Sequence, residues 1–128
     1  NLMLCLLFLM KKQFNSLVLL SILLNTLEKG VYMFYRIGKI KCKPGKSDNV
    51  ISYFKSKEDF FSETKGIISL SYFKSGQDEV SGIAVWESKE TLEANAERVQ
   101  SIMGGLMDFV TTPPEIVEGD LEYQFKGK

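Results

Sequence analysis

The chain has 128 residues, of which 16 are Lys or Arg, 16 are Asp or Glu, two are Cys and none is His. Its zero net charge argues against a nucleic-acid-binding protein, which would carry a basic surplus. The absence of histidine excludes Ser–His and Cys–His catalytic pairs, histidine-ligated zinc and haem held by a proximal histidine. Two cysteines make neither a four-thiolate metal site nor a disulfide framework, so the composition predicts no bound metal.

The composition changes abruptly near Met33. Residues 1–32 hold 11 of the 15 leucines and only four charged residues, whereas residues 33–128 hold 28 charged residues and a net charge of −2. The apolar blocks Leu2–Met10 and Phe14–Leu24 are each shorter than the roughly 20 apolar residues that a membrane-spanning helix needs. We therefore expect residues 1–32 to form an apolar leader outside the fold and residues 33–128 to form the domain.

Three interpretations of the leader stay open. We favour translation of AT-rich DNA upstream of a natural start, because a Leu-, Ile-, Asn- and Lys-rich string is typical of it and Met33 opens the first well-patterned strand. This interpretation predicts a cytoplasmic protein whose residues 33–128 have no membrane role. The second is a signal peptide or anchor within residues 10–32, which would make the protein exported or membrane-associated. The third is an extra helix docked on the domain.

The first half of the domain has the pattern of a strand followed by a helix. Phe34–Cys42 is a candidate strand, and Lys43–Gly45 ends it with a strong turn signal. Ser47 or Asp48 then caps a helix that runs to about Glu63, with apolar residues at helical spacing.

The second half predicts two strands, a helix and a last strand. Ile67–Lys74 and Val80–Glu87 are rich in β-branched and aromatic residues, and the hairpin loop between them is Ser75–Glu79. Ser88 caps a second helix, in which apolar residues recur every three or four positions. The last strand lies within Glu115–Phe125, where apolar and polar residues alternate.

This order of elements is βαββαβ, a ferredoxin-like α+β fold with a four-stranded antiparallel sheet and both helices on one face. The other face of the sheet carries apolar residues such as Ile37 and Ile83. A domain of this length has no second layer to cover them. We therefore expect a homodimer that packs sheet against sheet.

Three segments of the domain carry a family resemblance. Ile40–Lys46 resembles a V-x-V-K-P-G-K strand ending, and Ile83–Asn95 resembles a W-x-S-x-E-A-L-x-A-H segment. Gly105–Asp108 with Pro113–Glu115 resembles a G-L-x-x-L…P-P-E ending. These motifs are those of antibiotic biosynthesis monooxygenase (ABM) domains, and the resemblance covers residues 33–128 but none of the leader.

The resemblance implies a dimeric α+β barrel with a pocket between the sheet and its own helices. Family members include cofactor-independent oxygenases of quinol-like and polyketide substrates, haem-degrading enzymes and domains of no known activity. The histidine that the family carries on its second helix falls on Asn95 here, and Asn takes up no proton at neutral pH. The strand-one Asn of the haem-degrading branch falls on Gly38, and only Trp86 matches that branch. The resemblance therefore argues against haem degradation.

The candidate catalytic residues are Asn95, which would hydrogen-bond a substrate carbonyl or a reduced-oxygen intermediate, and Trp86, which would stack a flat aromatic substrate. The candidate substrate-binding residues are Trp86, Tyr72, Tyr53, Arg36, Gly38 and Met103. For each there is a structural alternative, namely core packing for the aromatic and Met side chains, cross-strand pairing for Arg36 and close packing for Gly38.

The sequence therefore predicts a cofactor-independent monooxygenase of small quinol-, phenol- or polyketide-like molecules. A substrate that ionises unaided passes an electron to oxygen itself, while the pocket desolvates and orients it. The expected partners are a second copy of the chain and a small aromatic molecule. The alternative is a non-enzymatic small-molecule-binding or stress-response domain with the same fold.

Overall fold

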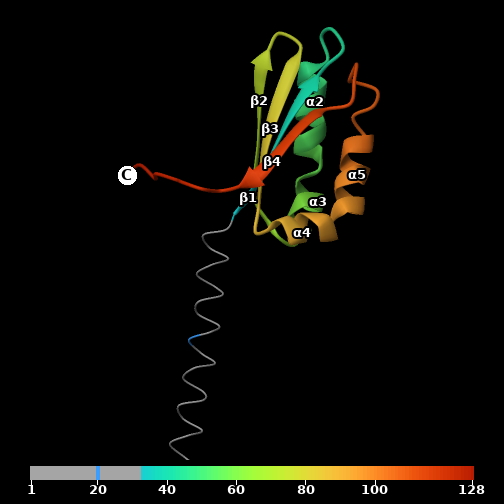
Figure 1. Ribbon diagram of the computed structural model, residues 1–128. Coiled ribbons are helices and arrows are strands. Elements are labelled where there is room, and N and C mark those ends of the chain that lie inside the picture. The colour runs from blue at the N-terminus through green and yellow to red at the C-terminus, as the bar shows by residue number, and fades with distance from the viewer. Residues whose placement is uncertain (1–19, 21–32) are drawn as a thin grey trace, which may run out of the picture. The chain divides into compact units, whose positions relative to one another are not determined.

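The computed structural model describes residue 20 and residues 33–128, so the predicted leader lies almost wholly outside the described residues. Contacts group Tyr32–Lys128 into one unit, separate from Asn1–Val31. The elements of the larger unit are labelled in Figure 1 and, in chain order, are β1 (Phe34–Lys41), α2 (Ser47–Ser56), α3 (Glu58–Ser62), β2 (Ile67–Gly76), β3 (Glu79–Trp86), α4 (Lys89–Ala94), α5 (Ala96–Gly104) and β4 (Glu115–Asp120).

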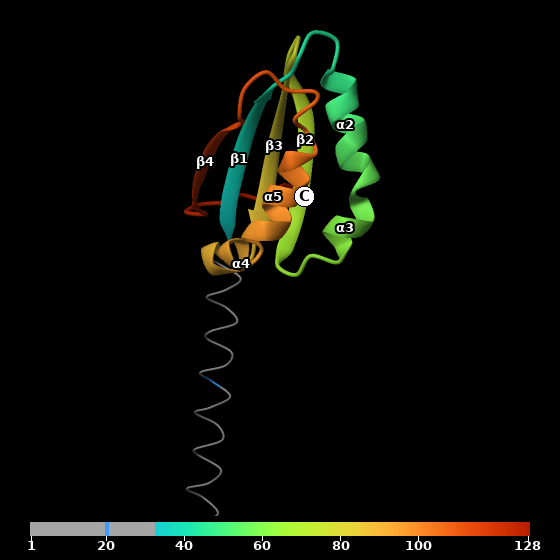
Figure 2. The same ribbon diagram turned by 90° about the vertical axis from the view of Figure 1, so that its right-hand side faces the viewer.

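The four strands form one antiparallel sheet in the order β2-β3-β1-β4. The helices cover one face of this sheet, as the two views in Figure 1 and Figure 2 show. The predicted ferredoxin-like α+β fold is therefore confirmed.

The register of β1 against β3 decides which side chains meet the helices. Phe34 pairs with Trp86 and Ile40 pairs with Val80, and all four side chains are nearly or fully buried. Because side chains alternate along a strand, Tyr35, Ile37 and Lys39 point to the opposite face, whereas Arg36 points to the same face as Phe34 and Ile40. Ile37 lies on that opposite face and is 40% exposed.

The core beneath the helices consists of two clusters. The first cluster lies at the C-terminal end of β1 and joins it to α2 and α5. The second lies at the N-terminal end of β1 and joins it to α4. Their buried members are Ile40, Cys42, Val50, Phe54, Val80, Ile102 and Leu106 in the first, and Phe34, Trp86 and Leu92 in the second.

The first helix differs from the prediction in its start and its continuity. α2 begins at Ser47 itself, and within the described residues no side chain caps it. The Ser47 side chain is instead buried and donates to the Gln77 carbonyl, while Asp48 pairs with Lys74. Lys57 then leaves the helical conformation, with φ −102° and ψ 14°, and separates α3 from α2.

The predicted cap of the second helix is confirmed. Ser88 is extended, and its side chain accepts a hydrogen bond of 3.1 Å from the Thr91 backbone N–H. The helix is interrupted at Asn95, where φ is −105° and ψ is 17°, so that α4 and α5 are separate segments.

The last strand is shorter than predicted, and the β2–β3 hairpin is tighter. β4 ends at Asp120 because its partner β1 begins at Phe34, directly opposite, and the Leu121 N–H makes a last bond to the Met33 carbonyl. Leu121–Lys128 continue without helix or strand and leave the sheet, as the red end of the ribbon in Figure 1 shows. β2 runs on to Gly76, which leaves only Gln77 and Asp78 for the turn.

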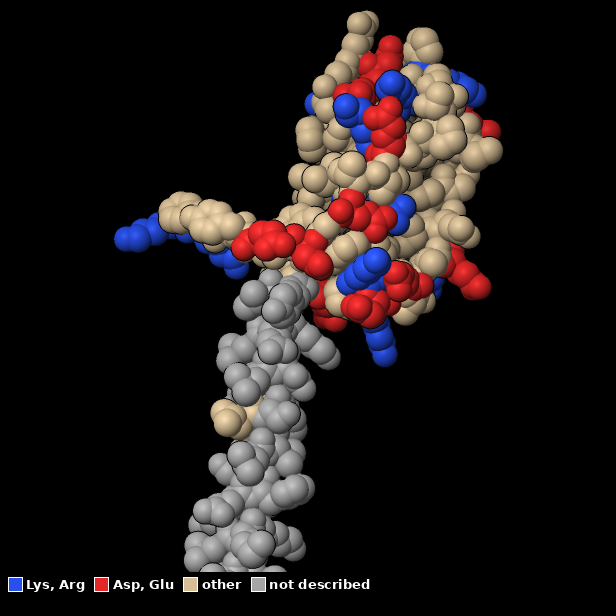
Figure 3. Space-filling model, viewed as in Figure 1, with Lys and Arg blue, Asp and Glu red and all other residues tan. Residues whose placement is uncertain are grey.

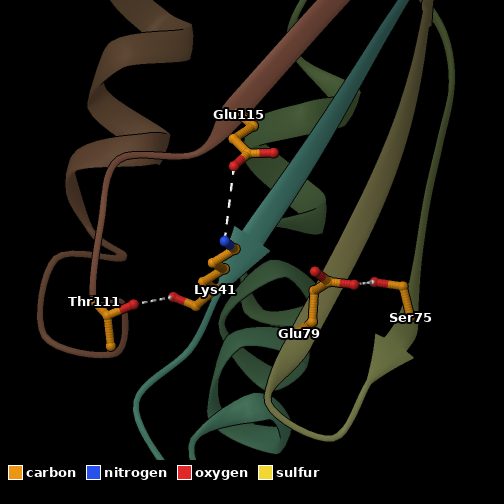
Figure 4. Close-up of polar contacts among 5 residues, drawn as sticks. All are labelled: Lys41, Ser75, Glu79, Thr111 and Glu115. Atoms are coloured by element: carbon orange, nitrogen blue, oxygen red, sulfur yellow. Dashed lines mark hydrogen bonds and ion pairs between the residues drawn. The ribbon is translucent and has the colours of Figure 1, made fainter.

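Polar contacts hold the end of the sheet where β1 finishes (Figure 4). Lys41 Nζ lies 3.8 Å from Glu115 Oε1, and the Thr111 hydroxyl donates to the Lys41 carbonyl at 3.3 Å. Ser75 donates to Glu79 Oε2 at 2.8 Å across the hairpin. These bonds fix the strand ends farthest from Trp86.

Charged side chains of both signs are interspersed on the face that Figure 3 presents. In the part of the chain that the structure describes, no helix has the length and apolar character needed to cross a membrane.

Candidate functional site

A cavity of about 70 Å³ lies between the sheet and the helices at the Trp86 end of the fold. Its walls are mostly apolar and come from β2, β3 and the helical segments α3, α4 and α5, with Arg36 from β1. The apolar lining residues are Phe60, Phe61, Ile67, Leu70, Ala84, Leu92, Val99, Ile102 and Met103, and the polar ones are Arg36, Thr64, Tyr72, Trp86 and Arg98. We call it the inner cavity.

Trp86 has the most unusual polar group of this lining. Its side chain is 3% exposed and packs with Phe34 and Leu92. Among the residues that the structure describes, Trp86 Nε1 is the only buried side-chain nitrogen or oxygen without a hydrogen-bond partner. Leaving a buried donor unpaired costs about 1–3 kcal/mol, so this N–H is a ready donor to any acceptor atom that enters beside it.

Arg98 closes the helix side of the cavity and is held by three contacts. Its Nε donates to the Thr64 hydroxyl at 3.0 Å, and its Nη2 donates to the Phe60 carbonyl at 3.2 Å. The centre of the guanidinium lies 4.1 Å from the centroid of the Phe60 ring. A planar cation on an aromatic face is a stable arrangement, so Arg98 places a fixed positive charge at the cavity.

Arg36 brings a second positive charge from the sheet side. Its Nη1 lies 3.6 Å from Glu118 Oε1, which is directly across from it on β4. The predicted alternative of cross-strand pairing is therefore what the structure contains, although Arg36 also lines the inner cavity.

Tyr72 is fixed between α2 and β3. Its ring stacks on Phe54 with centroids 3.8 Å apart, and it crosses Gly82, where any Cβ would collide with it. Burial raises the pKa of the Tyr72 phenol to about 12, although the nearby Arg36 guanidinium lowers it in part. Tyr72 is therefore a neutral hydrogen-bond donor at physiological pH and not a base.

The structure brings four of the sequence-predicted residues together at the inner cavity and leaves three outside it. Trp86, Tyr72, Arg36 and Met103 line the cavity. Asn95, Tyr53 and Gly38 lie outside this lining.

Asn95 occupies the break between α4 and α5. Its side-chain nitrogen donates to the Lys65 carbonyl at 3.1 Å and to the Thr91 carbonyl at 2.9 Å. Both amide hydrogens are thereby engaged in tying the helix junction to the loop before β2. The catalytic role that the sequence predicts for Asn95 stays a prediction, and this geometry gives the side chain a positioning task.

Tyr53 and Gly38 also have packing tasks. The Tyr53 hydroxyl donates to the Ile102 carbonyl, and its ring fills the space that Gly105 leaves by having no Cβ. A Cβ on Gly38 would lie 3.2 Å from Ile116 Cδ1, so this glycine allows a close approach between β1 and the side chain of β4.

Sequence reasoning missed Arg98, Thr64 and the Phe60–Phe61 pair. Arg98 precedes the buried Ile102 by four residues, so helical spacing alone could have placed it on the inward face. Thr64 is 7% exposed although it follows a charged helix end, and its hydroxyl accepts from Arg98 and donates to the Phe60 carbonyl.

A second, more open cavity of about 280 Å³ adjoins the first on the β2 side. We call it the outer cavity. It is lined by Ile51, Phe54, Lys55, Glu58, Phe61, Leu70 and Tyr72. Phe61, Leu70 and Tyr72 belong to both linings, so the cavities share a wall.

Neither lining resembles a metal centre. No three Asp, Glu or Cys side chains gather into a metal-binding group anywhere in the described residues. The inner cavity presents hydrogen-bond donors, which hold ligand oxygen atoms and repel cations.

Solved structures share this fold. A monooxygenase from Streptomyces coelicolor in complex with the ligand nanaomycin D matches with a TM-score of 0.66 and 17% identity, over 77% of this chain and 96% of that chain. A protein of Chloroflexus aurantiacus assigned to the antibiotic biosynthesis monooxygenases matches with a TM-score of 0.60 and 21% identity, over 73% and 97%. A Nitrosomonas europaea protein of unknown function matches with a TM-score of 0.65 and 13% identity, over 77% and 97%.

No protein-family model and no curated protein sequence matches the chain. The structural likenesses confirm that the chain has the fold of antibiotic biosynthesis monooxygenase domains, as the motifs at β1 and at the β3–α4 junction predicted.

Proposed function

We propose that this chain, with the fold of the antibiotic biosynthesis monooxygenases, is a cofactor-independent monooxygenase of small phenol- or quinol-like molecules. The observation that carries the proposal is the unpaired, buried N–H of Trp86, a residue that lines a mostly apolar cavity. An aromatic substrate with an oxygen substituent supplies an acceptor atom for this N–H and an apolar ring for the surrounding apolar side chains.

The charges of the lining favour a substrate that carries a negative oxygen. Two guanidiniums, Arg36 and Arg98, reach the inner cavity, and Tyr72 stays protonated because its pKa is about 12. Of the described residues that line this cavity, none is a carboxylate. A phenolate or enolate oxygen is stabilised by such donors, which lowers the pKa of the bound substrate.

The reaction needs little from the protein beyond this binding. The bound anion passes an electron to molecular oxygen, and the substrate radical and superoxide combine to form a carbon–oxygen bond and a peroxide anion, which takes a proton from water to become a hydroperoxide. Loss of water from the hydroperoxide leaves a quinone, so one oxygen atom enters the product and the other leaves as water. The substrate supplies all the electrons, and the cavity contributes orientation and exclusion of water.

A non-enzymatic binding domain is the second candidate, and a specific observation favours it. The chain has no histidine, and the polar groups of the inner cavity are all donors at neutral pH or hydroxyls. A site without a proton acceptor suits a receptor for an acidic aromatic molecule as well as it suits an enzyme.

Oxygen uptake by the full chain with a panel of quinols and hydroxynaphthoquinones tests the proposal. Trp86→Phe keeps an aromatic ring and removes the N–H, so uptake above autoxidation should fall about 10-fold or more, as for loss of one oxyanion donor. Tyr53→Phe is the matched control, because its hydroxyl serves the Ile102 carbonyl outside the cavity. Binding of a panel member without uptake would select the receptor, and neither binding nor uptake would overturn both.

We also propose that a second copy of the chain covers the open face of the sheet. Ile37, Phe73 and Val117 lie there on three different strands and are 40%, 49% and 64% exposed. Exposed apolar side chains that gather on one sheet face are typical of an interface. Sedimentation should find a dimer at micromolar concentration that Ile37→Lys weakens, and a monomer would contradict this proposal.

A further inference from the structure

We propose that the inner and outer cavities are two ends of one ligand site, and that the Phe61 side chain is the movable wall that sets which ligands reach Trp86. This inference rests on the proposed function in one respect only, namely that the ligand binds beside Trp86. The ligand class is a planar aromatic molecule with an acidic oxygen at one end.

The residues shared by the two linings identify the dividing wall. Leu70 and Tyr72 lie on β2, where they form a floor that continues beneath both cavities. Phe61, on α3, is the one shared residue that comes from a helix. The wall that rises between the cavities is therefore the Phe61 ring.

The floor cannot move without disturbing the sheet. The backbone of Leu70 pairs with Ala84 on β3. Tyr72 is clamped between the Phe54 ring and Gly82, as described above. The Tyr72 ring therefore cannot swing aside while the strands stay paired, and the backbone of Leu70 is held in place by the same pairing.

Phe61 differs in this respect from its neighbour Phe60. The Phe60 carbonyl accepts bonds from Thr64 and Arg98, and the Arg98 guanidinium covers its ring. Phe61 and Phe60 are both partly buried and meet edge to face with ring centroids 6.4 Å apart, but of these two rings only that of Phe60 has a cation over it. All five residues of α3 are partly or fully exposed, and Lys57 separates this short helix from α2. The Phe61 ring is therefore freer than the Phe60 ring to change rotamer.

The sizes of the cavities explain why the two ends must join. An apolar cavity of about 150 Å³ accommodates a benzene ring. The inner cavity, at about 70 Å³, is too small for a ring, and the outer cavity, at about 280 Å³, is large enough. A ligand would keep its rings in the outer cavity and pass its oxygen beyond Phe61 to the donors at Trp86.

Trp86 is the only tryptophan of the chain, so its fluorescence reports on access to the inner cavity. Acrylamide quenching of the full chain is the test. Phe61→Ala should raise the quenching constant several-fold, and Phe61→Leu should raise it less, because Leu retains part of the wall. Ile51→Ala is the matched control, because it enlarges the outer cavity but leaves the Phe61 wall in place.

A rise in both Phe61 variants, with Ile51→Ala unchanged, supports the inference, provided that near-UV circular dichroism shows native packing. Unchanged quenching in natively packed Phe61→Leu, or an equal rise in Ile51→Ala, would overturn it. Oxygen uptake separates the two proposals. Quenching that depends on Phe61 in a protein without uptake refutes the enzyme alone, and uptake without dependence on Phe61 refutes the wall alone.

Discussion

The two faces of the sheet are built from the same strands and have different environments. On β1, Ile40 faces the helices and is 2% exposed, whereas Ile37, three residues earlier, faces away and is 40% exposed. Both faces carry apolar side chains, but among the described residues helices cover only one of them. The covered face therefore supplies the core and the cavity, whereas apolar side chains on the open face stay exposed to solvent.

Truncation of the two isoleucines should give the largest contrast. Ile40→Ala removes fully buried carbons and should lower the free energy of unfolding by about 2–5 kcal/mol. Ile37→Ala should cost about 1 kcal/mol or less in dilute protein, because its side chain already contacts water. Urea denaturation of the full chain measures both.

Protein concentration sharpens this contrast. If a second copy covers the open face, the cost of Ile37→Ala grows with protein concentration and the cost of Ile40→Ala does not. If Ile40→Ala and Ile37→Ala lower the free energy of unfolding equally in dilute protein, the claim that only Ile40 is buried in a single chain is wrong.

Alkaline pH should reveal the burial of Tyr72 on the covered face. The pKa of its phenol is about 12 in the folded chain, against about 10 in an unfolded one. Between pH 10 and pH 12 the unfolded chain loses the phenol proton before the folded chain does. This phenol therefore leaves the free energy of unfolding unchanged below pH 10 and lowers it by about 2–3 kcal/mol as the pH approaches 12.

Tyr72→Phe has no phenol to lose a proton at this position. Its free energy of unfolding should therefore rise relative to that of the wild type between pH 10 and 12. Denaturation at a series of pH values measures the gap, and Tyr123→Phe, whose side chain is 82% exposed, controls for the loss of a surface phenol. A constant gap between wild type and Tyr72→Phe across this range would show that burial does not affect the phenol.

Two strand glycines offer the smallest contrast. A Cβ on Gly82, on the covered face, would lie 2.6 Å from Tyr72 Cδ1, whereas no atom of the described residues comes within 4 Å of a Cβ on Gly119, on the open face. Gly82→Ala should therefore cost about 1–3 kcal/mol, and Gly119→Ala should be neutral. Thermal unfolding compares them, and a neutral Gly82→Ala would argue against the fixed position of Tyr72.

The parts of the fold that depend on local pattern were predictable from the sequence. The βαββαβ order of elements, the Ser88 cap and the inward position of Trp86 follow from alternation, capping chemistry and the family motifs. The breaks at Lys57 and Asn95 were not predictable, because the residues on both sides keep helical spacing. At the second break, the Asn95 side chain bonds to the Lys65 carbonyl, 30 residues away, which only the folded chain brings close to it.

The last strand and the cavity show the same limit. Tyr123 and Phe125 alternate as a strand should, yet β1 has no residues left to pair with them beyond Phe34. The cavity depends on Arg98 and Phe60, which meet across 38 positions of sequence. Contacts between residues so far apart in the sequence depend on tertiary packing, which local sequence patterns do not predict.

The central claim is that the Trp86 N–H donates to an oxygen of a bound aromatic ligand, and nuclear magnetic resonance tests it most directly. The full chain labelled with nitrogen-15 has one indole N–H signal, because Trp86 is its only tryptophan. Titration with a hydroxynaphthoquinone should move this signal downfield to a saturating limit, as expected when a free donor gains an acceptor. An indole signal that stays in place while backbone signals around the cavity shift would contradict the claim.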